Sequence, residues 1–282
     1  MSNIRQCFVS RRGDAGRLVE ADLSQIEIVC LAELSDDPQL KTDIRLGVDF
    51  HTLMLSQQLG IPYETAMEKL KAQEPGIVKQ RHDVKCVRFK KNYGGGVRGV
   101  AKGLGLREEV VKELYRLEDE RYPGVPRMHA AWLDTVERSK TPSESRTTLG
   151  YPACVGFLTC PFTRKRYTFL EEDAPSFTGK EVSFRPTQIK NYAVQGLAAE
   201  LVKLAIGDIA RKHPRVLMIN TIHDSIVVDV RVEYVHAVVD ILRNVLEDLP
   251  ASMEATYGVT WDTPIRCDIS TGVHWGAMEK LK

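Results

Sequence analysis

The stretch Ala21–Glu27, "ADLSQIE", carries two carboxylates at the point where an extended segment gives way to a helix. Before it, "GRLVEADLS" (16–24) has the short apolar run of a strand, and after it "SQIEIVCLAELS" (24–35) is mostly apolar with helical spacing. Ser24 followed three residues later by Glu27 is typical of a capping box, which satisfies two free N–H groups at a helix start. The sequence therefore predicts that Asp22 lies at a strand-to-helix junction.

The composition is that of an ordinary globular protein. The 282 residues are enough for about two domains. With 43% hydrophobic residues the chain is expected to fold, and with 39 Lys and Arg against 38 Asp and Glu the overall charge gives no sign of a nucleic-acid binder, so only local clusters of basic residues could indicate one. No apolar run approaches the roughly 18 residues of a membrane span, so no membrane partner is expected. The six cysteines form no C-x-x-C pair and the seven histidines are scattered, which argues for a reducing, cytoplasmic setting and against a zinc site.

Periodicity places further elements on both sides of a helical middle. Strand patterns occur near both ends of the chain, and 143–184 is the least regular part, with a hairpin expected within 156–169. The remaining expected elements are helices over 50–59, 77–93, 107–139 with a break at 121–126, 186–211 and 233–249, a hairpin from 216–222 and 226–230, and a strand near 263–270. This order predicts an α+β fold with a helical insertion.

The hairpin tip "IHDSI" (222–226) carries a second carboxylate, Asp224. Aspartate is favoured in turns for its own backbone hydrogen bonds, so Asp224 alone is compatible with a structural role, as Glu27 alone is compatible with a cap. A pair of divalent ions about 4 Å apart, however, needs carboxylates from separate segments of the chain. Asp22 and Asp224, each at a strand end, meet that requirement.

The segment "RHDVKCVRFKKNYG" (81–94) has four side chains that recur every fourth residue and so share one helix face: Arg81, Lys85, Phe89 and Tyr93. A solvated basic face with two aromatic rings tucked beneath it would explain the pattern structurally. The order from cations to rings also suits a nucleoside triphosphate, with phosphates at one end and sugar and base at the other. Three further cations add local positive charge, namely Arg88, Lys90 and Lys91.

These motifs together resemble the palm and fingers of family A DNA polymerases, the DNA polymerase I type with its bacteriophage members. Residues 21–27 resemble the family's motif A, 81–94 its motif B helix, and His223-Asp224 its motif C. Shorter matches follow in the family's order: "IRQCF" (4–8), "DFH" (49–51), "RYPGV" (121–125), "NYAVQG" (191–196) and "GVHW" (272–275).

The resemblance implies an α+β fold in which a large, mostly helical fingers insertion interrupts an antiparallel palm sheet. The implied parts are palm over 1–35, fingers over 36–184 with the motif B helix at about 77–93, and palm again over 185–282 with the motif C hairpin. The family's thumb and exonuclease domains have no counterpart here. We therefore expect the C-terminal part of a split or truncated polymerase, working with an N-terminal partner chain in the cytoplasm of a bacterium or phage-infected host.

The implied activity is template-directed DNA synthesis from dNTPs on primer-template DNA, with two Mg²⁺ ions bound by Asp22 and Asp224. Lys85 would join these aspartates in catalysis, as a proton donor to pyrophosphate. The expected nucleotide contacts are Gln25, Glu27, His51, Arg81, Phe89 and Tyr93. The expected DNA contacts are Asn191, Gln195 and His223.

A departure from the family pattern in motif C keeps an alternative open. Ser225 follows Asp224 where the family usually has Glu, and "HDS" also occurs in single-subunit RNA polymerases. Glu27 favours DNA synthesis over RNA synthesis, because the resemblance implies that its side chain, bonded to Tyr93, would exclude a ribose 2′-hydroxyl. This role conflicts with a role of Glu27 in capping the helix. Phe89 implies discrimination against dideoxynucleotides. A non-catalytic nucleic-acid-binding remnant is the alternative of another class, and a phosphatase or nuclease would leave the 81–93 face unexplained.

Overall fold

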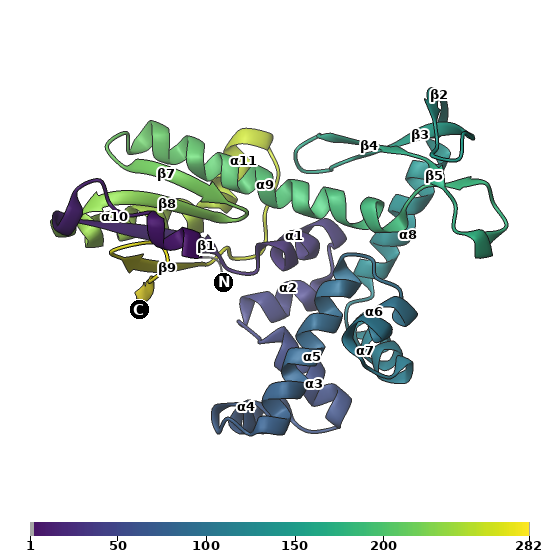
Figure 1. The fold of residues 1–282 in the computed structure, drawn as a ribbon, viewed down its shortest axis with the longest axis horizontal. Coiled ribbons are helices and arrows are strands. Elements are labelled where there is room, and N and C mark those ends of the chain that lie inside the picture. The colour runs from purple at the N-terminus through teal and green to yellow at the C-terminus, as the bar shows by residue number, and fades with distance from the viewer. Residues whose placement is uncertain (1–2, 282) are drawn as a thin grey trace. The chain divides into compact units, whose positions relative to one another are not determined.

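The computed structural model describes residues 3–281, which form two compact units (Figure 1). The sheet unit comprises Met1–Glu33 with Gln195–Lys282, and the helical unit comprises Leu34–Val194. The second boundary lies ten residues later than the expected 184/185, because α9 (Pro186–Lys212) is one continuous helix that belongs to both units. Asn191 consequently lies in the helical unit and Gln195 in the sheet unit.

The sheet unit contains a five-stranded sheet in the order β10-β9-β1-β8-β7. Every neighbouring pair is antiparallel. The strands are β1 (Gly16–Leu23), β7 (Leu217–Ile222), β8 (Ser225–Arg231), β9 (Cys267–Gly272) and β10 (Glu279–Leu281). The strand that carries Asp22 therefore lies at the centre, between strands from the far end of the chain.

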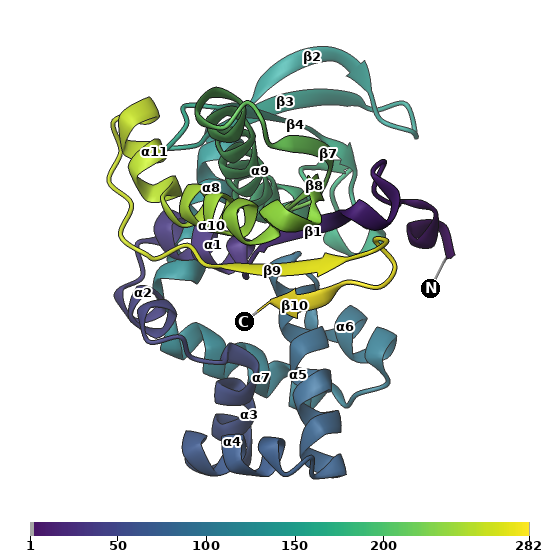
Figure 2. The same cartoon turned by 90° about the vertical axis from the view of Figure 1, so that its left-hand side faces the viewer.

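The two faces of β1 differ because side chains alternate along a strand. Val19, Ala21 and Leu23 are buried on one face, which α10 (Val235–Glu247) covers with its own apolar stripe (Figure 2). Glu20 and Asp22 therefore point to the opposite face. Further elements of this unit are α1 (Ile26–Ser35), α11 (Leu249–Tyr257) and the short helices η1 (Asn3–Cys7), η2 (Gly13–Ala15) and η4 (Val232–Tyr234).

The helical unit begins with seven helices: α2 (Pro38–Arg45), α3 (Phe50–Leu59), α4 (Tyr63–Lys71), α5 (Pro75–Asn92), α6 (Val97–Leu104), α7 (Glu108–Arg121) and α8 (Gly124–Arg138). The "RYPGV" segment joins α7 to α8 and packs on α2. Gly124 donates its N–H to the Asp37 carboxylate at 2.7 Å, and a Cβ on Gly124 would meet the Asp37 Cβ at 2.8 Å. Only glycine permits this close approach.

Buried ion pairs lock α5 against α7. The Arg88 guanidinium is 4% exposed and bonds Glu118 at 2.7 Å, while Lys91 Nζ bonds Asp119 at 2.7 Å and Glu118 at 3.2 Å. The expectation that Arg88 and Lys91 add charge to a binding face is therefore wrong. Because a buried cation requires a paired carboxylate, these residues hold the helices together instead.

A second part of the helical unit is built from strands and is more regular than expected for 143–184. The three-stranded sheet β2-β3-β4 consists of β2 (Thr141–Arg146), β3 (Pro152–Thr159) and β4 (Arg166–Leu170). A small pair, β5 (Glu172–Asp173) and β6 (Val182–Ser183), follows with η3 (Ser176–Thr178). The hairpin expected within 156–169 is confirmed as β3-β4.

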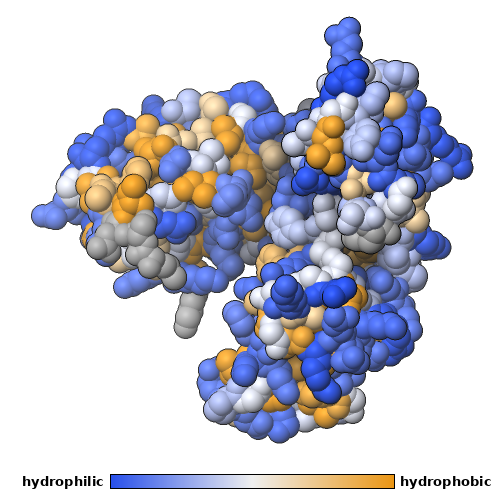
Figure 3. All heavy atoms as spheres, turned by 45° about the vertical axis from the view of Figure 1, so that its right-hand side comes forward, coloured by the Kyte–Doolittle hydropathy of each residue, from blue (hydrophilic) through white to orange (hydrophobic). Residues whose placement is uncertain are grey.

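The α+β fold class predicted from the sequence is confirmed, and α3 has the expected bounds. Sequence patterns missed α2, α4, α6, α11 and β10, each of which is nine residues long or shorter. Among residues 3–281 no helix is long and apolar enough to cross a membrane. On the face shown in Figure 3, apolar side chains form separate patches among hydrophilic ones.

Candidate active site

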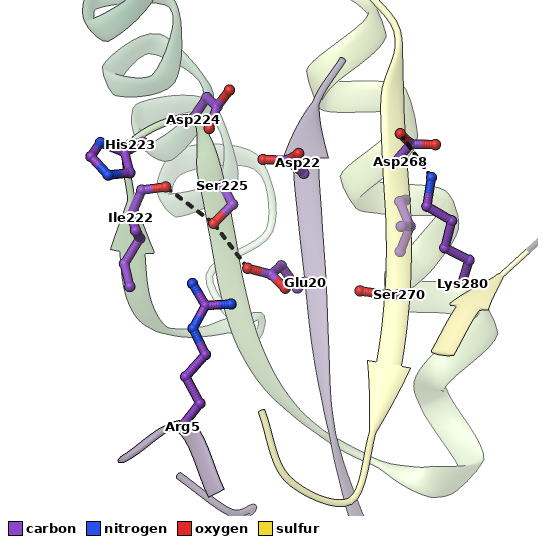
Figure 4. Close-up of a pocket in the computed structure, with 11 residues that line it drawn as sticks. Arg5, Glu20, Asp22, Ile222, His223, Asp224, Ser225, Asp268, Ser270 and Lys280 are labelled. Carbon is purple, nitrogen blue, oxygen red and sulfur yellow. Dashed lines mark hydrogen bonds and ion pairs between the residues drawn. The ribbon is translucent and has the colours of Figure 1, made fainter. Parts of the chain in front are cut away.

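The register of the central strands brings Asp22 and Asp224 together. Asp22 pairs with Ser225 on β8 and with Asp268 on β9, and the N–H of Leu23 donates to the carbonyl of Asp224 at 3.2 Å. Figure 4 shows Asp224, Asp22 and Asp268 in one row at the same end of three neighbouring strands. Residues 22 and 224, about 200 positions apart in the sequence, therefore face a common space, as the two motifs predict.

Both aspartates sit beside an unusual backbone conformation. His223, the first residue of the β7-β8 turn, has a φ of 53°, and Gln25, between β1 and α1, has a φ of 55°. Left-handed backbone costs roughly 1–2 kcal/mol for a residue with a Cβ. Such strain clusters at functional sites, where the surrounding structure maintains it. The strained turns fix the directions in which the chain leaves Asp22 and enters Asp224.

A pocket of about 360 Å³ lies over this face of the sheet. Its polar lining includes four carboxylates, Glu20, Asp22, Asp224 and Asp268, and two cations, Arg5 and Lys280. Lys280 bonds Asp268 at 3.2 Å, so the acidic row is only partly neutralised at its β9 end. The remaining negative charge is concentrated at the β1 and β8 ends of the pocket and would favour a cation there.

The ionisation of Asp22 reflects these surroundings. Burial, followed by the neighbouring charge and hydrogen bond of Asp224, raises the pKa of Asp22 to about 6. Glu20 and Asp268 add smaller repulsions. Near pH 7 burial and the neighbouring carboxylates therefore destabilise the charged form of Asp22, and a bound cation would reduce this cost.

Ser225 contacts a carboxylate that the sequence analysis did not single out. Its Oγ donates to Glu20 Oε1 at 3.1 Å, and Figure 4 shows Glu20 on the same face as Asp22. Asp268 was also missed. The sequence could have indicated Glu20, because it lies two residues before Asp22 in the same strand and so shares its face. A carboxylate also stands out in a strand that has apolar residues at Leu18 and Leu23. Asp268 had no such signal, since its position depends on how β9 pairs with β1.

The site fits Mg²⁺ in its donor chemistry. Asp22 and Asp224 offer hard carboxylate oxygens within hydrogen-bonding range of each other. Among residues 3–281 no group of three or more His, Cys, Asp or Glu side chains is arranged to hold a metal. The two carboxylates match the way in which protein sites usually hold Mg²⁺, through one or two carboxylates together with water and substrate phosphates.

The start of α1 differs from the predicted capping box. The helix begins at Ile26, so Gln25 rather than Ser24 precedes the first helical residue. The Ser24 N–H donates to the carbonyl of Arg266 at 2.8 Å. Gln25 is exposed, and Glu27 is partly buried in the first turn of α1.

The second group of predicted residues lies on α5, in the helical unit. Phe89 and Tyr93 are 46% and 41% exposed, so the rings are not tucked into the core. Lys85 Nζ lies 5.8 Å from the Phe89 ring centroid, and the His51 ring lies 6.2 Å from it. The structure therefore brings the exposed Lys85 and Phe89 together with the partly buried His51.

Arg81 is held in place by Asp49, the first residue of "DFH". Its Nη2 bonds Asp49 Oδ2 at 2.6 Å, and its Nε bonds Thr52 Oγ1 at 2.9 Å. The other oxygen of Asp49 accepts the N–H groups of His51 and Thr52 and caps α3. Burial would raise the pKa of Asp49, but the hydrogen bond from Arg81 and the cap bonds lower it below its usual range. Asp49 is thus ionised and orients Arg81.

His51 is neutral in this environment. Burial, followed by the nearby charge of Arg88, lowers its pKa to about 4. Arg88 Nη1 lies 3.4 Å from His51 Nδ1. At neutral pH, His51 can therefore offer a hydrogen bond to an anion but no full charge.

The predicted DNA contacts lie in two places. Asn191 and Gln195 are partly buried and one turn apart, so they share a face of α9. His223 is exposed at the tip of the β7-β8 hairpin and lines the carboxylate pocket.

Comparison with known proteins gives consistent matches. The family model described as DNA polymerase family A matches residues 1–277. DNA polymerase I of Rhizobium leguminosarum is 26% identical over 279 residues, covering 96% of this chain and 24% of that protein. DNA polymerase I of Pseudomonas aeruginosa is 27% identical over 273 residues, covering 92% of this chain and 26% of that protein. The chain thus spans about a quarter of the length of these curated relatives.

The fold also matches a solved structure. The POL domain of Pol1 from M. smegmatis, described in complex with DNA primer-template and dNTP, superposes with a TM-score of 0.67 at 21% identity. The match covers 98% of this chain and 42% of that chain. At this identity the match shows that the two share a fold.

Proposed function

The chain belongs to DNA polymerase family A, and on that premise we propose that it carries the centre for template-directed addition of a dNTP to a primer 3′-hydroxyl. The observation that supports this most directly is the closeness of the Asp22 and Asp224 carboxylates where β1 ends and β8 begins. The reaction joins the 3′-oxygen to the α-phosphorus of the nucleotide, and pyrophosphate leaves.

In this proposal Asp22 and Asp224 bind two Mg²⁺ ions and set the position of the reacting groups. The ions would lower the pKa of the primer hydroxyl and neutralise charge on the triphosphate. The raised pKa of Asp22 supports this assignment, because the apo carboxylates repel each other in the absence of a cation. Glu20, which accepts the Ser225 hydroxyl, adds negative charge to the pocket where motif C lacks its usual Glu.

The helical unit would bind the nucleotide. Arg81 and Lys85 would contact the β- and γ-phosphates, and Lys85 would return a proton to pyrophosphate as it leaves. His51, neutral in the free protein, would donate a hydrogen bond to the same phosphates. Phe89 and Tyr93 would stack near sugar and base, which their exposure permits.

The remaining predicted residues would select the substrate. Glu27 would exclude a ribose 2′-hydroxyl, and Gln25 would contact the nucleotide from the adjoining strained turn. Asn191, Gln195 and His223 would contact primer or template near the growing end. The proposal includes a partner chain that binds the duplex, because phosphate contacts supply most of the affinity for DNA. It also includes a cytoplasmic location.

The test is single-nucleotide extension of a primed template in Mg²⁺, supplied with dNTP or rNTP, using the whole chain. Asp224→Asn should lose at least about 10²-fold in rate, as expected when a charged group at the reaction centre is removed. Asp240→Asn, an exposed aspartate on α10, is the matched control and should keep full activity.

Three outcomes would contradict the proposal in different ways. Extension with rNTP as efficient as with dNTP would indicate an RNA polymerase. Unchanged extension in Asp224→Asn would remove the carboxylate pair from the mechanism. Absence of extension, even with excess primer-template at low salt, together with no stabilisation of the protein by Mg²⁺, would indicate a remnant without catalytic function.

A further inference from the structure

The three-stranded sheet β2-β3-β4 has one covered face and one exposed face. Gly156, Leu158 and Phe169 face α8, and the latter two side chains are 4% and 2% exposed. A Cβ on Gly156 would lie 2.5 Å from the carbonyl oxygen of Val136 on α8. This side of the sheet is therefore packed as a core.

The opposite face follows from the alternation of the strands. Phe157 pairs with Thr168, and Thr159 pairs with Arg166, so these four side chains share one side. Thr159, Arg166 and Thr168 are exposed, and Phe157 is partly buried. The hairpin tip beyond them carries Arg164, which is also exposed and has a φ of 59°. We call these five residues the hairpin face.

Arg166 lies flat on the Phe157 ring, with its Cζ 3.6 Å from the ring centroid. A stacked guanidinium holds its orientation and keeps its N–H edge available for a phosphate. Within the part of the chain that the structure describes, the side chains of Arg164 and Arg166 form no ion pair. Their charges are therefore available to an anionic ligand.

Of the three acidic residues that follow β4, Glu171 and Glu172 have cationic partners, and Asp173 accepts the backbone N–H of Leu149. Lys140 bonds Glu171 at 2.6 Å, and Arg185 pairs with Glu172. They consequently do not neutralise the two arginines of the hairpin face. The surface combines fixed positive charge, threonine hydroxyls and one aromatic ring.

We propose that the hairpin face binds single-stranded DNA, with phosphates on Arg164 and Arg166 and a base against Phe157. Arginine, hydroxyl donors and a ring on an open sheet face are what single-strand binding uses, because each unstacked base has a face for stacking. A duplex presents phosphates but no free base face. The proposal goes beyond the polymerase function, since this binding requires neither the carboxylate pocket nor a nucleotide.

The test is the salt dependence of binding to a fluorescent oligothymidylate without Mg²⁺. For a single strand the slope of log K against log[salt] changes by about 0.7 per phosphate contact. The double variant Arg164→Ala/Arg166→Ala should flatten the slope by about 1.4. Arg116→Ala/Arg138→Ala is the matched control, because these exposed arginines of the same unit are ion-paired on their own helices. Its slope should not change.

A second pair of variants tests the ring. Phe157→Leu should weaken oligothymidylate binding at least about fivefold at every salt concentration, and Phe157→Tyr should preserve it. Thermal melting confirms that each variant is folded. An unchanged slope in the arginine variant, or a loss in Phe157→Leu that is equally large for duplex DNA, would overturn the proposal.

Discussion

Replacing Asp22 with asparagine should stabilise the metal-free protein. The pKa of Asp22 is raised from 3.8 to about 6. A carboxyl whose pKa is higher in the folded state contributes stability at low pH, and that contribution is lost as pH rises through the folded pKa. At pH 7.5 the ionised Asp22 therefore weakens the fold, and the neutral amide of asparagine removes this cost.

The magnitude follows from the size of the shift. Two pKa units correspond to about 3 kcal/mol, which partial exposure of the site reduces to about 2 kcal/mol. For a chain of this size we expect the melting temperature of Asp22→Asn to rise by about 4–8 °C at pH 7.5. The difference from wild type should shrink between pH 6 and pH 4, where Asp22 takes up a proton.

The assay is thermal unfolding in chelator, followed at several pH values, for wild type, Asp22→Asn and the exposed control Asp240→Asn. Mg²⁺ should raise the melting temperature of the wild type and have little effect on Asp22→Asn. If Asp22→Asn melts no higher than wild type at pH 7.5, or if its advantage is the same at pH 4, then the carboxylates do not repel each other as inferred.

The helical unit allows further predictions. Asp49→Asn keeps the cap of α3 and loses the charge that holds Arg81, so KM for dNTP should rise while the free energy of unfolding in urea changes by less than about 1 kcal/mol. Asp49→Ala loses the cap as well, so it should both raise KM and lower the free energy of unfolding. Equal stability of the two variants would argue against the cap. Glu118→Leu leaves Arg88 buried without its main partner and should lower the free energy of unfolding in denaturant by about 3–5 kcal/mol. The double variant Arg88→Met/Glu118→Leu should recover most of this loss. No recovery in the double variant would mean that the loss comes from packing and not from charge. Gly156→Val should lower the melting temperature by several degrees because its Cβ meets α8; an unchanged melting curve would show that β3 can move away from α8.

Much of the fold could be predicted from local pattern. The bounds of α3, the break between α7 and α8 and the β7-β8 hairpin follow from periodicity and turn residues, which act over a few neighbouring positions. The closeness of Asp22 and Asp224 could be inferred only because each motif lies at a strand end. Its register needed the structure, since strand pairing depends on contacts between distant segments.

Charge partners were the least predictable feature. Arg88 and Lys91 look like Lys85 in the sequence, yet α7 supplies carboxylates to the first two. Asp49 likewise gave no sign that it would orient Arg81, 32 residues away. Such pairs are decided by helix packing, which periodicity within one helix does not encode.

The two left-handed residues, Gln25 and His223, have a consequence for how the sheet opens. Each stores conformational energy that neighbouring strand pairing must offset, so the ends of β1 and β8 should be the first part of the sheet to exchange their amide hydrogens with solvent. The Leu23 N–H donates a hydrogen bond to the carbonyl of Asp224 and so connects the end of β1 to the β7-β8 turn. Its exchange rate therefore reports whether the two aspartates are held together, and slower exchange on adding Mg²⁺ would register occupancy of the site without any turnover.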